Sequence, residues 1–99
     1  MKRLKNVAKL RSMLQEMERE LGLCELRPVE RDVLYAMHAL SADQGEVVRS
    51  DAIKSHPLCD GIPPASFHRT LKTLISLGFV QPAPHRKTGA YLCVTAERA

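Results

Sequence analysis

The sequence predicts a small, mostly α-helical fold that ends in a short β-hairpin. Up to Gly78, apolar residues recur at intervals of three and four in most segments, which is the spacing of amphipathic helices. After Gly78 the period shortens, and the runs FVQPA and YLCVT enclose PHRKTG, as expected for two strands joined by a basic turn. Because 99 residues suffice for one core only, we divide the chain into an N-terminal helix, residues 1–24, and a domain, residues 25–99.

The composition predicts an ordinary globular protein of the cytoplasm. Hydrophobic residues make up 44% of the chain and charged residues 26%. No apolar run approaches the roughly 18–20 residues needed to cross a bilayer, and the start MKRLKNVAKLR lacks the apolar centre of a secretory signal. The cysteines, Cys24, Cys59 and Cys93, are odd in number and irregularly spaced, which argues against a disulfide framework.

The net charge of +4 is unevenly distributed along the chain. Residues 1–23 carry six Lys and Arg against three acidic residues, and residues 61–99 carry five against one. Residues 24–60, in contrast, carry four basic residues against seven acidic ones. A basic excess that is concentrated in particular segments favours a polyanionic partner more than a uniform excess does.

The first predicted element is a helix over about residues 3–22, which Gly22 is well placed to end. Five apolar residues are spaced three, four, three and four, as in the seam of a coiled coil or a helical hairpin: Val7, Leu10, Leu14, Met17 and Leu21. About two and a half heptads are too short to be stable alone. We therefore predict that this helix pairs with a second copy in a homodimer. The alternative is that it packs on the core of its own chain.

A second helix is expected to start at Pro28, which suits the first helical position. Its apolar face is Val29, Val33, Ala36, Met37 and Leu40. SADQG is interpreted as its exit loop, and residues 46–48 as a short strand. Ser50 is expected to cap a short third helix that Pro57 closes.

A fourth helix, residues 64–77, has two different faces. Phe67, Leu71, Leu74 and Gly78 are spaced four, three and four, so we expect them to line one side. The polar residues fall elsewhere around the helix: Ser66, His68, Arg69, Lys72 and Thr73.

The order of these elements over residues 26–95 resembles the winged helix–turn–helix of MarR-like transcription regulators. The segments that carry the resemblance are LRPVERDVLYAMHAL, SDAIKSH, IPPASFHRTLKTLISLGFV and HRKTGAYLCV. It implies that the helix after the turn lies in the major groove of double-stranded DNA and that the hairpin, or wing, touches the backbone or minor groove. The positions it places on the DNA are Pro64, Ala65, Ser66, His68, Arg69, Lys72, Arg86 and Lys87. Arg27 and Pro63 depart from the pattern, since a capping Ser or Thr often stands there.

The residue chemistry agrees with such a role. Arg69 offers a fork for guanine O6 and N7 or for a phosphate, and Lys72 offers a point charge for the DNA backbone. Ser66 lies in the first turn, where backbone N–H groups and the helix dipole favour a phosphate oxygen. The alternative interpretation is that these residues are solvated surface charges without a ligand. On that interpretation, the domain is a winged-helix module for protein–protein interaction that does not bind DNA.

Other chemistry has weaker support in the sequence. His56 and Cys59 are spaced H-x₂-C, and His68 or His85 could join them, but zinc motifs usually show paired ligands at both ends. Cys59 is a candidate thiol sensor. Phosphate-binding loops and nucleophile motifs were not found, so we expect no catalysis and no cofactor, and no small-molecule ligand can be inferred. Tyr35 and Tyr91 are expected at the edge of the core.

Overall fold

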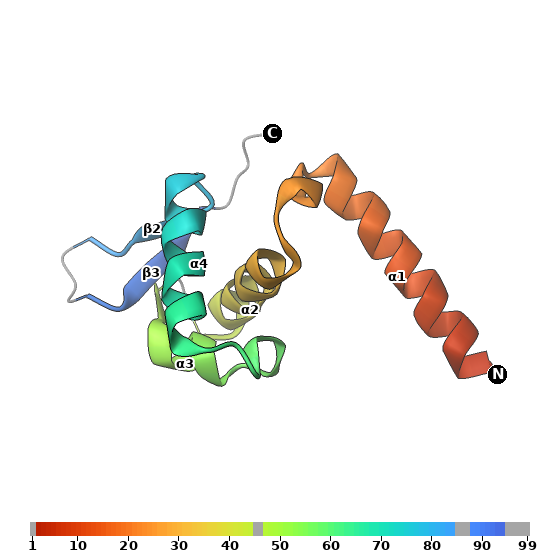
Figure 1. Ribbon diagram of the computed structural model, residues 1–99, viewed down its shortest axis with the longest axis horizontal. Helices are drawn as coiled ribbons and strands as arrows, with labels where there is room; N and C mark the ends of the chain where they lie inside the picture. Colours follow the sequence, from red (N-terminus) through yellow and green to blue (C-terminus); the bar gives the residue numbers. More distant parts are fainter. Residues whose placement is uncertain (1, 45–46, 85–87, 95–99) are drawn as a thin grey trace.

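The protein is mostly helical with a small antiparallel sheet, as the sequence predicts. The computed structural model describes residues 2–44, 47–84 and 88–94, and the side chains of these except 42–44. The helices are α1 (Lys2–Glu20), α2 (Pro28–Gln44), α3 (Ser50–Ser55) and α4 (Pro64–Ser76), with the 3₁₀ turns η1 (Leu23–Glu25) and η2 (Pro57–Cys59). The strands are β1 (Val47–Arg49), β2 (Val80–Pro82) and β3 (Ala90–Cys93). Figure 1 shows α2, α3, α4 and the sheet gathered into one body, from which α1 extends.

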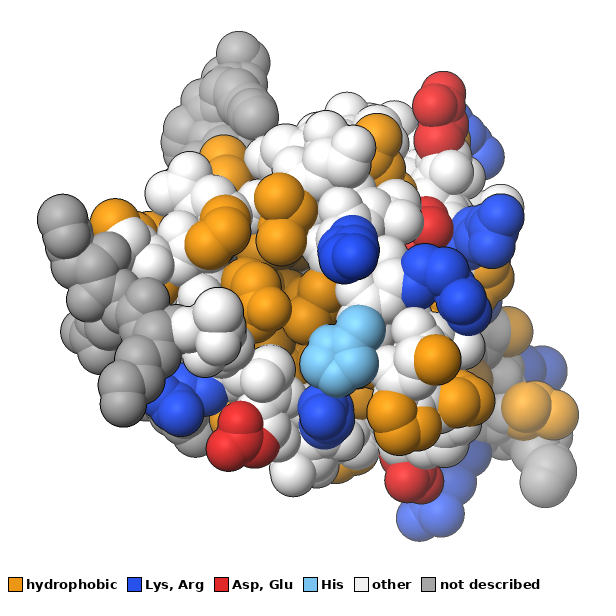
Figure 2. Space-filling view, turned by 60° about the vertical axis from the view of Figure 1, so that its left-hand side comes forward, with side chains coloured by type: hydrophobic (Ala, Val, Ile, Leu, Met, Phe, Trp, Pro, Cys, Tyr) orange, Lys and Arg blue, Asp and Glu red, His pale blue; other side chains and the backbone are white. Residues whose placement is uncertain are grey.

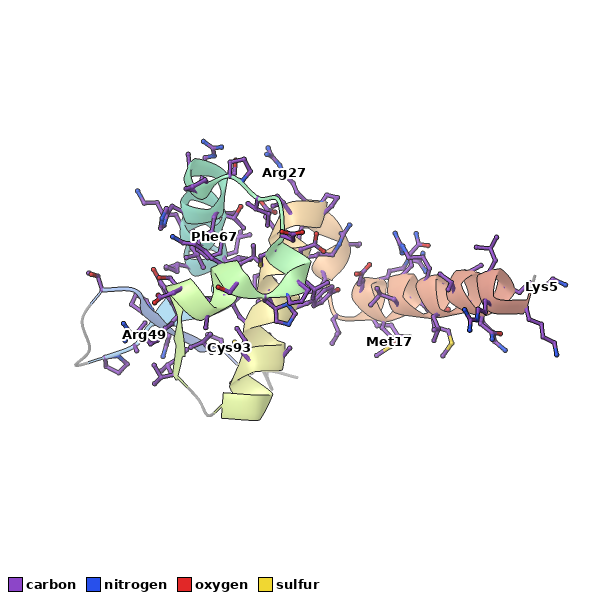
Figure 3. The ribbon with its side chains drawn as sticks, turned by 90° about the horizontal axis from the view of Figure 1, so that it is seen from below. Lys5, Met17, Arg27, Arg49, Phe67 and Cys93 are labelled. Carbon is purple, nitrogen blue, oxygen red and sulfur yellow. The ribbon has the colours of Figure 1, made fainter. Side chains whose placement is uncertain are left out.

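Helix α1 is attached to the body at one end only. It ends at Glu20, two residues earlier than predicted, and Gly22 follows in the left-handed conformation at φ 76°. That conformation favours glycine, so the expected role of Gly22 at this end is confirmed. Along α1 every side chain except that of Glu18 is exposed. Figure 3 shows Lys5 at the far end of the helix, remote from the body. The alternative in which α1 packs on its own core is therefore not what the structure shows.

A buried carboxylate fastens the near end of α1 to α2. Glu18 is only 6% exposed, and its Oε2 accepts a hydrogen bond of 2.6 Å from the Tyr35 hydroxyl. The Arg31 Nε lies 3.7 Å from the same oxygen. Arg31 also donates to the carbonyl oxygens of Leu23 and Leu26, at 3.2 and 2.8 Å. A charge taken out of water needs such partners, and these fix the elbow between α1 and α2, residues 18–35.

Helix α2 begins at Pro28, as predicted, and the Glu30 carboxylate accepts the backbone N–H of Arg27 at 2.8 Å. This bond satisfies a donor at the N-terminus that the Arg27 side chain cannot cap. The predicted exit loop is wrong for residues 41–44, which remain helical. Ser, Ala, Asp and Gln are all tolerated in helices, and the first strong helix breaker in SADQG is Gly45.

The expected apolar face of α2 is confirmed and is wider than predicted. Val33, Ala36 and Met37 are fully buried, whereas Val29 and Leu40 are half-buried. Leu34 is also buried, although it lies outside the predicted pattern. A helix contacted on two sides buries a broader arc than a single stripe. In α2 this follows because α4 and η2 both pack on it, with β1 and α3 beside them.

The sheet has three strands, not the two-stranded hairpin that the sequence suggested. Its order is β1-β3-β2, all antiparallel, with Val48 opposite Tyr91 and Gln81 opposite Leu92. The short strand expected near residues 46–48 therefore pairs with the hairpin from outside. Pro82 lies in β2, on the edge of the sheet, as its lack of an N–H requires.

Helix α3 starts one residue earlier than predicted. Arg49 occupies the N-cap position and Ser50 is the first helical residue, so the expected capping role of Ser50 is wrong. The Ser50 N–H donates instead to the Gly89 carbonyl at 2.8 Å. The sheet thus satisfies a donor that a capping side chain would otherwise accept. The helix closes at His56, whose backbone is extended before Pro57, as predicted.

The core lies where α4 packs on α2. Phe67, Leu71 and Leu74 of α4 are almost completely buried, together with Ile53 and Val80. Gly78, which we expected on the same face, lies beyond the end of the helix, is exposed and has φ 88°.

Gly78 forms a Schellman cap. Its N–H donates to the Ile75 carbonyl at 3.0 Å, and the Phe79 N–H donates to the Leu74 carbonyl at 3.0 Å. The half-buried Phe79 ring then packs against the core. The cap turns the chain from α4 directly into β2. This is why Gly78 follows the apolar residues of α4 at the same spacing without lying on their face.

Replacing Tyr35 by Phe should weaken the elbow and change the pH dependence of stability. Burial, then the hydrogen bond to Glu18, raises the pKa of Tyr35 to about 12. The folded state therefore keeps this proton when the unfolded chain, with a pKa of about 10, has lost it. Stability from this group is complete below pH 10 and is lost as the pH rises through 12. In urea denaturation, Tyr35→Phe should lower the unfolding free energy by about 1–3 kcal/mol at pH 7.

The variant should also lose less stability than the wild type between pH 10 and 12. Tyr91→Phe is the matched control, because Tyr91 is half-buried in β3. Equal pH profiles for wild type and Tyr35→Phe would contradict the assigned role of the Tyr35–Glu18 bond.

Candidate nucleic-acid interface

The outward side of α4 carries the polar residues that the sequence singled out. With Phe67, Leu71 and Leu74 fixed in the core, the helical period turns Ala65, Arg69 and Lys72 to the opposite side, where all three are exposed. His68 is exposed on one flank of this face, and Ser66 is half-buried on the other. Pro64 is exposed at the first helical position. The structure thus places together the six predicted residues that α4 contains.

The start of α4 is open to a ligand. Pro63 occupies the N-cap position with an extended backbone, and its ring has no atom that accepts a hydrogen bond. Pro64 follows without an N–H, so the first-turn donors are the backbone groups of Ala65 and Ser66. The positive end of the helix dipole points the same way. The Arg69 Nη2 lies 3.3 Å from the Ser66 Oγ, where it donates a hydrogen bond and adds a cation to this end of the helix.

A shallow depression of about 380 Å³ borders this end of α4. Ser66, Arg69 and Thr73 line it from α4, and Arg27 and Glu30 line it from the start of α2. Figure 3 shows Arg27 on the side of the molecule where α4 lies. In the sequence, Arg27 is notable only as the residue that stands where a capping Ser or Thr is expected. An arginine directly before Pro28 could also have indicated an exposed cation at the N-terminus of α2, beside the candidate interface on α4.

Lys54 adds a second cation that the sequence analysis missed. It lies in α3, and its Nζ is 5.6 Å from the centre of the Phe67 ring, within reach of a cation–π interaction. The His68 ring meets the same Phe67 ring edge-on, also at 5.6 Å between centroids. One aromatic ring therefore holds a lysine near the His68 flank of α4. Lys54 and Phe67 lie in different helices, so no periodicity in the sequence indicates that they contact each other.

The face around α4 is mixed in character, with a positive excess. Figure 2 shows Lys and Arg side chains on several sides of an exposed histidine and an apolar patch, with acidic side chains at the rim and also between the cations on the right. Asp51 and Asp60 are exposed on α3 and after η2 and reduce the local charge. The predicted wing residues Arg86 and Lys87 lie outside the described residues. Thr88 marks the point where the described chain returns toward β3.

The remaining candidates for chemistry are used structurally. The His56 Nδ1 accepts the Leu58 N–H at 3.1 Å and thereby caps η2. Cys59 is buried, and this burial, with the negative charge of Asp32, raises the pKa of its thiol to about 11. A protonated, inaccessible thiol is a poor sensor. Within residues 2–44, 47–84 and 88–94 no three His, Cys, Asp or Glu side chains are grouped to hold a metal ion.

The three free cysteines should differ sharply in reactivity toward a thiol reagent such as Ellman's reagent at pH 8. Cys24 is exposed and should react first, whereas burial raises the pKa of both Cys59 and Cys93 and should slow them. All three should react at once in denaturant. Cys24→Ser is the control, since it should remove the fast phase alone. A Cys59 that reacts as fast as Cys24 in the native protein would revive the sensor hypothesis.

Comparison with known proteins identifies no relative from which a function could be transferred. No protein-family model matches the chain, and no curated protein or solved structure matches it. Among the described helices, none combines the length and apolar character needed to span a membrane. A functional assignment therefore depends on the geometry and charge of the outward face of α4.

Proposed function

We propose that this chain is a winged helix–turn–helix protein that binds double-stranded DNA as a homodimer and regulates transcription. The observation that carries the proposal is the outward face of α4, with Arg69 and Lys72 exposed beside a helix start that is open to an anion. On this proposal α4 enters the major groove and the hairpin between β2 and β3 is the wing. The protein would act in the cytoplasm.

The order of elements supports the winged-helix interpretation. Helix α2 is followed by β1, α3, α4 and the pair β2–β3, and β1 joins the same sheet. The segment between α3 and α4 includes η2 and is longer than the three or four residues of a minimal turn. Because α4 packs on α2 through its apolar side, its polar side is free to meet a partner.

The kinds of side chain on this face support DNA as the partner. Arg69 can form two parallel hydrogen bonds to guanine, or a fork on a phosphate. Cations are added around it by Lys54 of α3, by Lys72 of α4 and by Arg27, which directly precedes α2. Cations that neutralise phosphates provide affinity, and base contacts provide specificity. We assign Arg69 to base contact, and Lys72 to the DNA backbone. Arg86 and Lys87 of the wing are also assigned to the backbone, on the sequence alone.

The proposed homodimer rests on the apolar stripe of α1. Val7, Leu10, Leu14, Met17 and Leu21 are all exposed, with Leu10 at 63% and Leu21 at 68%. Isolated leucines on a surface need no partner, but a continuous row at heptad spacing usually has one. A second copy of α1 would cover the row with apolar side chains of the same spacing.

Substitution of Arg69 tests the groove assignment. Binding of a selected duplex should weaken steeply with salt, because each neutralised phosphate contributes about −0.9 to the log–log slope. Arg69→Ala should cost about 1–3 kcal/mol on the selected site and much less on random duplex, since a lost base contact matters only where the base is right. Fluorescence anisotropy at several salt concentrations measures both quantities.

Arg19→Ala is the matched control, because it removes an exposed arginine from α1 and leaves α4 intact. Substituting Arg86 and Lys87 by Ala should instead flatten the salt slope and weaken all sequences alike. Equal losses for Arg69→Ala on selected and random duplex would make Arg69 a phosphate contact. No duplex binding by the wild type at low salt would favour the protein-interaction module.

A charge in the middle of the stripe tests the dimer. Leu14→Asp should shift the protein from dimer to monomer in sedimentation velocity at tens of micromolar, because burying an unpaired carboxylate is strongly unfavourable. Ser12→Asp adds the same charge at a position outside the stripe and should leave the dimer intact. A monomeric wild type at this concentration would contradict the proposed homodimer.

A further inference from the structure

We propose that two copies of α1 pair in antiparallel orientation, so that the basic half of each helix lies along the acidic half of its partner. The inference rests on the homodimer proposed above and adds its geometry. The occupant of the exposed stripe is then a second copy of this chain, with its globular body at the opposite end of the helix pair. Four observations lead to this arrangement.

The first observation is the charge of the two halves of α1. Residues 2–11 hold five basic side chains and no acidic one, and residues 12–20 hold three glutamates and one arginine. All of these side chains except Glu18 are exposed. Arg3 lies on the seam and Arg11 and Glu20 flank it, whereas Lys5 and Glu16 face away from the stripe. Parallel pairing gathers the two basic halves at one end of the pair, and antiparallel pairing sets Arg3 beside Glu20 of the partner helix. Like charges placed side by side on helices are destabilising and opposite charges are stabilising.

The second observation concerns Arg3, which falls on the seam itself. The heptad positions that continue the stripe toward the N-terminus place residue 3 one heptad before Leu10. In a parallel pair the two Arg3 side chains would meet across the seam. In an antiparallel pair each would lie near the C-terminal end of the partner helix, where the helix dipole favours a cation.

The third observation is the short length of the seam. About two and a half heptads provide few apolar layers, and such a pair is marginal by itself. Its orientation is therefore decided by the flanking charges more readily than in a long coiled coil. The body, which the Glu18 contacts hold at the C-terminal end of α1, leaves the N-terminal half open along its length.

The fourth observation is an apolar pocket of about 280 Å³ where the stripe ends. Leu21 of the stripe borders it, together with Leu23, Leu34, Tyr35 and Phe79 from the body. The pocket prolongs the apolar stripe past the end of α1. In an antiparallel pair the N-terminal turn of the partner helix, with the exposed Leu4, arrives beside this pocket.

Distances between spin labels at three outward positions distinguish the two orientations. Lys5, Ser12 and Arg19 are seven residues apart, on the side of α1 away from the stripe. Each is replaced in turn by Cys in a Cys24→Ser, Cys93→Ser background, labelled, and measured within the dimer by electron–electron double resonance. A parallel pair gives the same distance for all three labels. An antiparallel pair gives a distance at Lys5 that includes an axial offset of about 20–30 Å, and a shorter one at Ser12.

Sedimentation of each labelled protein separates the two proposals. A dimer with a long Lys5 distance and a short Ser12 distance supports the antiparallel pair. A dimer with three equal distances overturns it and leaves the homodimer standing. A monomer overturns the homodimer, and with it the inference.

A charge reversal provides a second readout. The double variant Arg3→Glu, Arg11→Glu should weaken an antiparallel dimer at least tenfold at low salt, and adding Glu20→Lys should restore part of the loss. In a parallel dimer the first variant replaces repulsion between cations by repulsion between carboxylates. The affinity of a parallel dimer should therefore change little. An unchanged dimer affinity for that variant would therefore contradict the antiparallel arrangement.

Discussion

The packing of α4 on α2 determines what this protein presents to its surroundings. Phe67, Leu71 and Leu74 are buried almost completely. If α4 were rotated about its axis, at least one of them would leave the core. The helical period then dictates the position of every other side chain on α4. Arg69 and Lys72 are exposed because the apolar residues are not. The outward face is thus a consequence of the core.

The same core also organises the neighbouring elements. Phe67 holds Lys54 of α3 over its ring and His68 against its edge. At the other end of α4, the Gly78 cap leads Phe79 onto the core and the chain into β2. A change at one buried residue would therefore displace several groups on the candidate interface at once. The stability of the core and the geometry of the candidate interface are therefore coupled through shared side chains.

Much of this arrangement could be predicted from the sequence, because apolar periodicity reports which side of a helix is buried. The start of α2 at Pro28, the end of α3 before Pro57 and the buried residues of α4 all followed from local rules. The pairing of β1 with β3 did not, since a three-residue strand has no local signal for its partner. Ser50 and Gly78 were misplaced for a related reason, because the sheet and the cap set their roles.

The candidate site divides in the same way. The six residues on α4 were found because they are neighbours in sequence with a common helical face. Arg27 and Lys54 join them only through contacts between elements far apart in the chain. The elbow formed by Glu18, Arg31 and Tyr35 was not predicted at all, since glutamate on a helix is ordinarily a solvated residue.

Because α1 is attached to the body at one end only, its helix content depends on what else covers it. A helix of this length with one anchored end is only marginally helical in water. If a partner covers its stripe, the ordering of α1 and the association of two chains become one equilibrium. Dilution would then unwind the helix while the body stayed folded, and far-ultraviolet circular dichroism would depend on concentration. The supply of the chain, rather than a bound effector, would decide whether two bodies are held at a fixed separation.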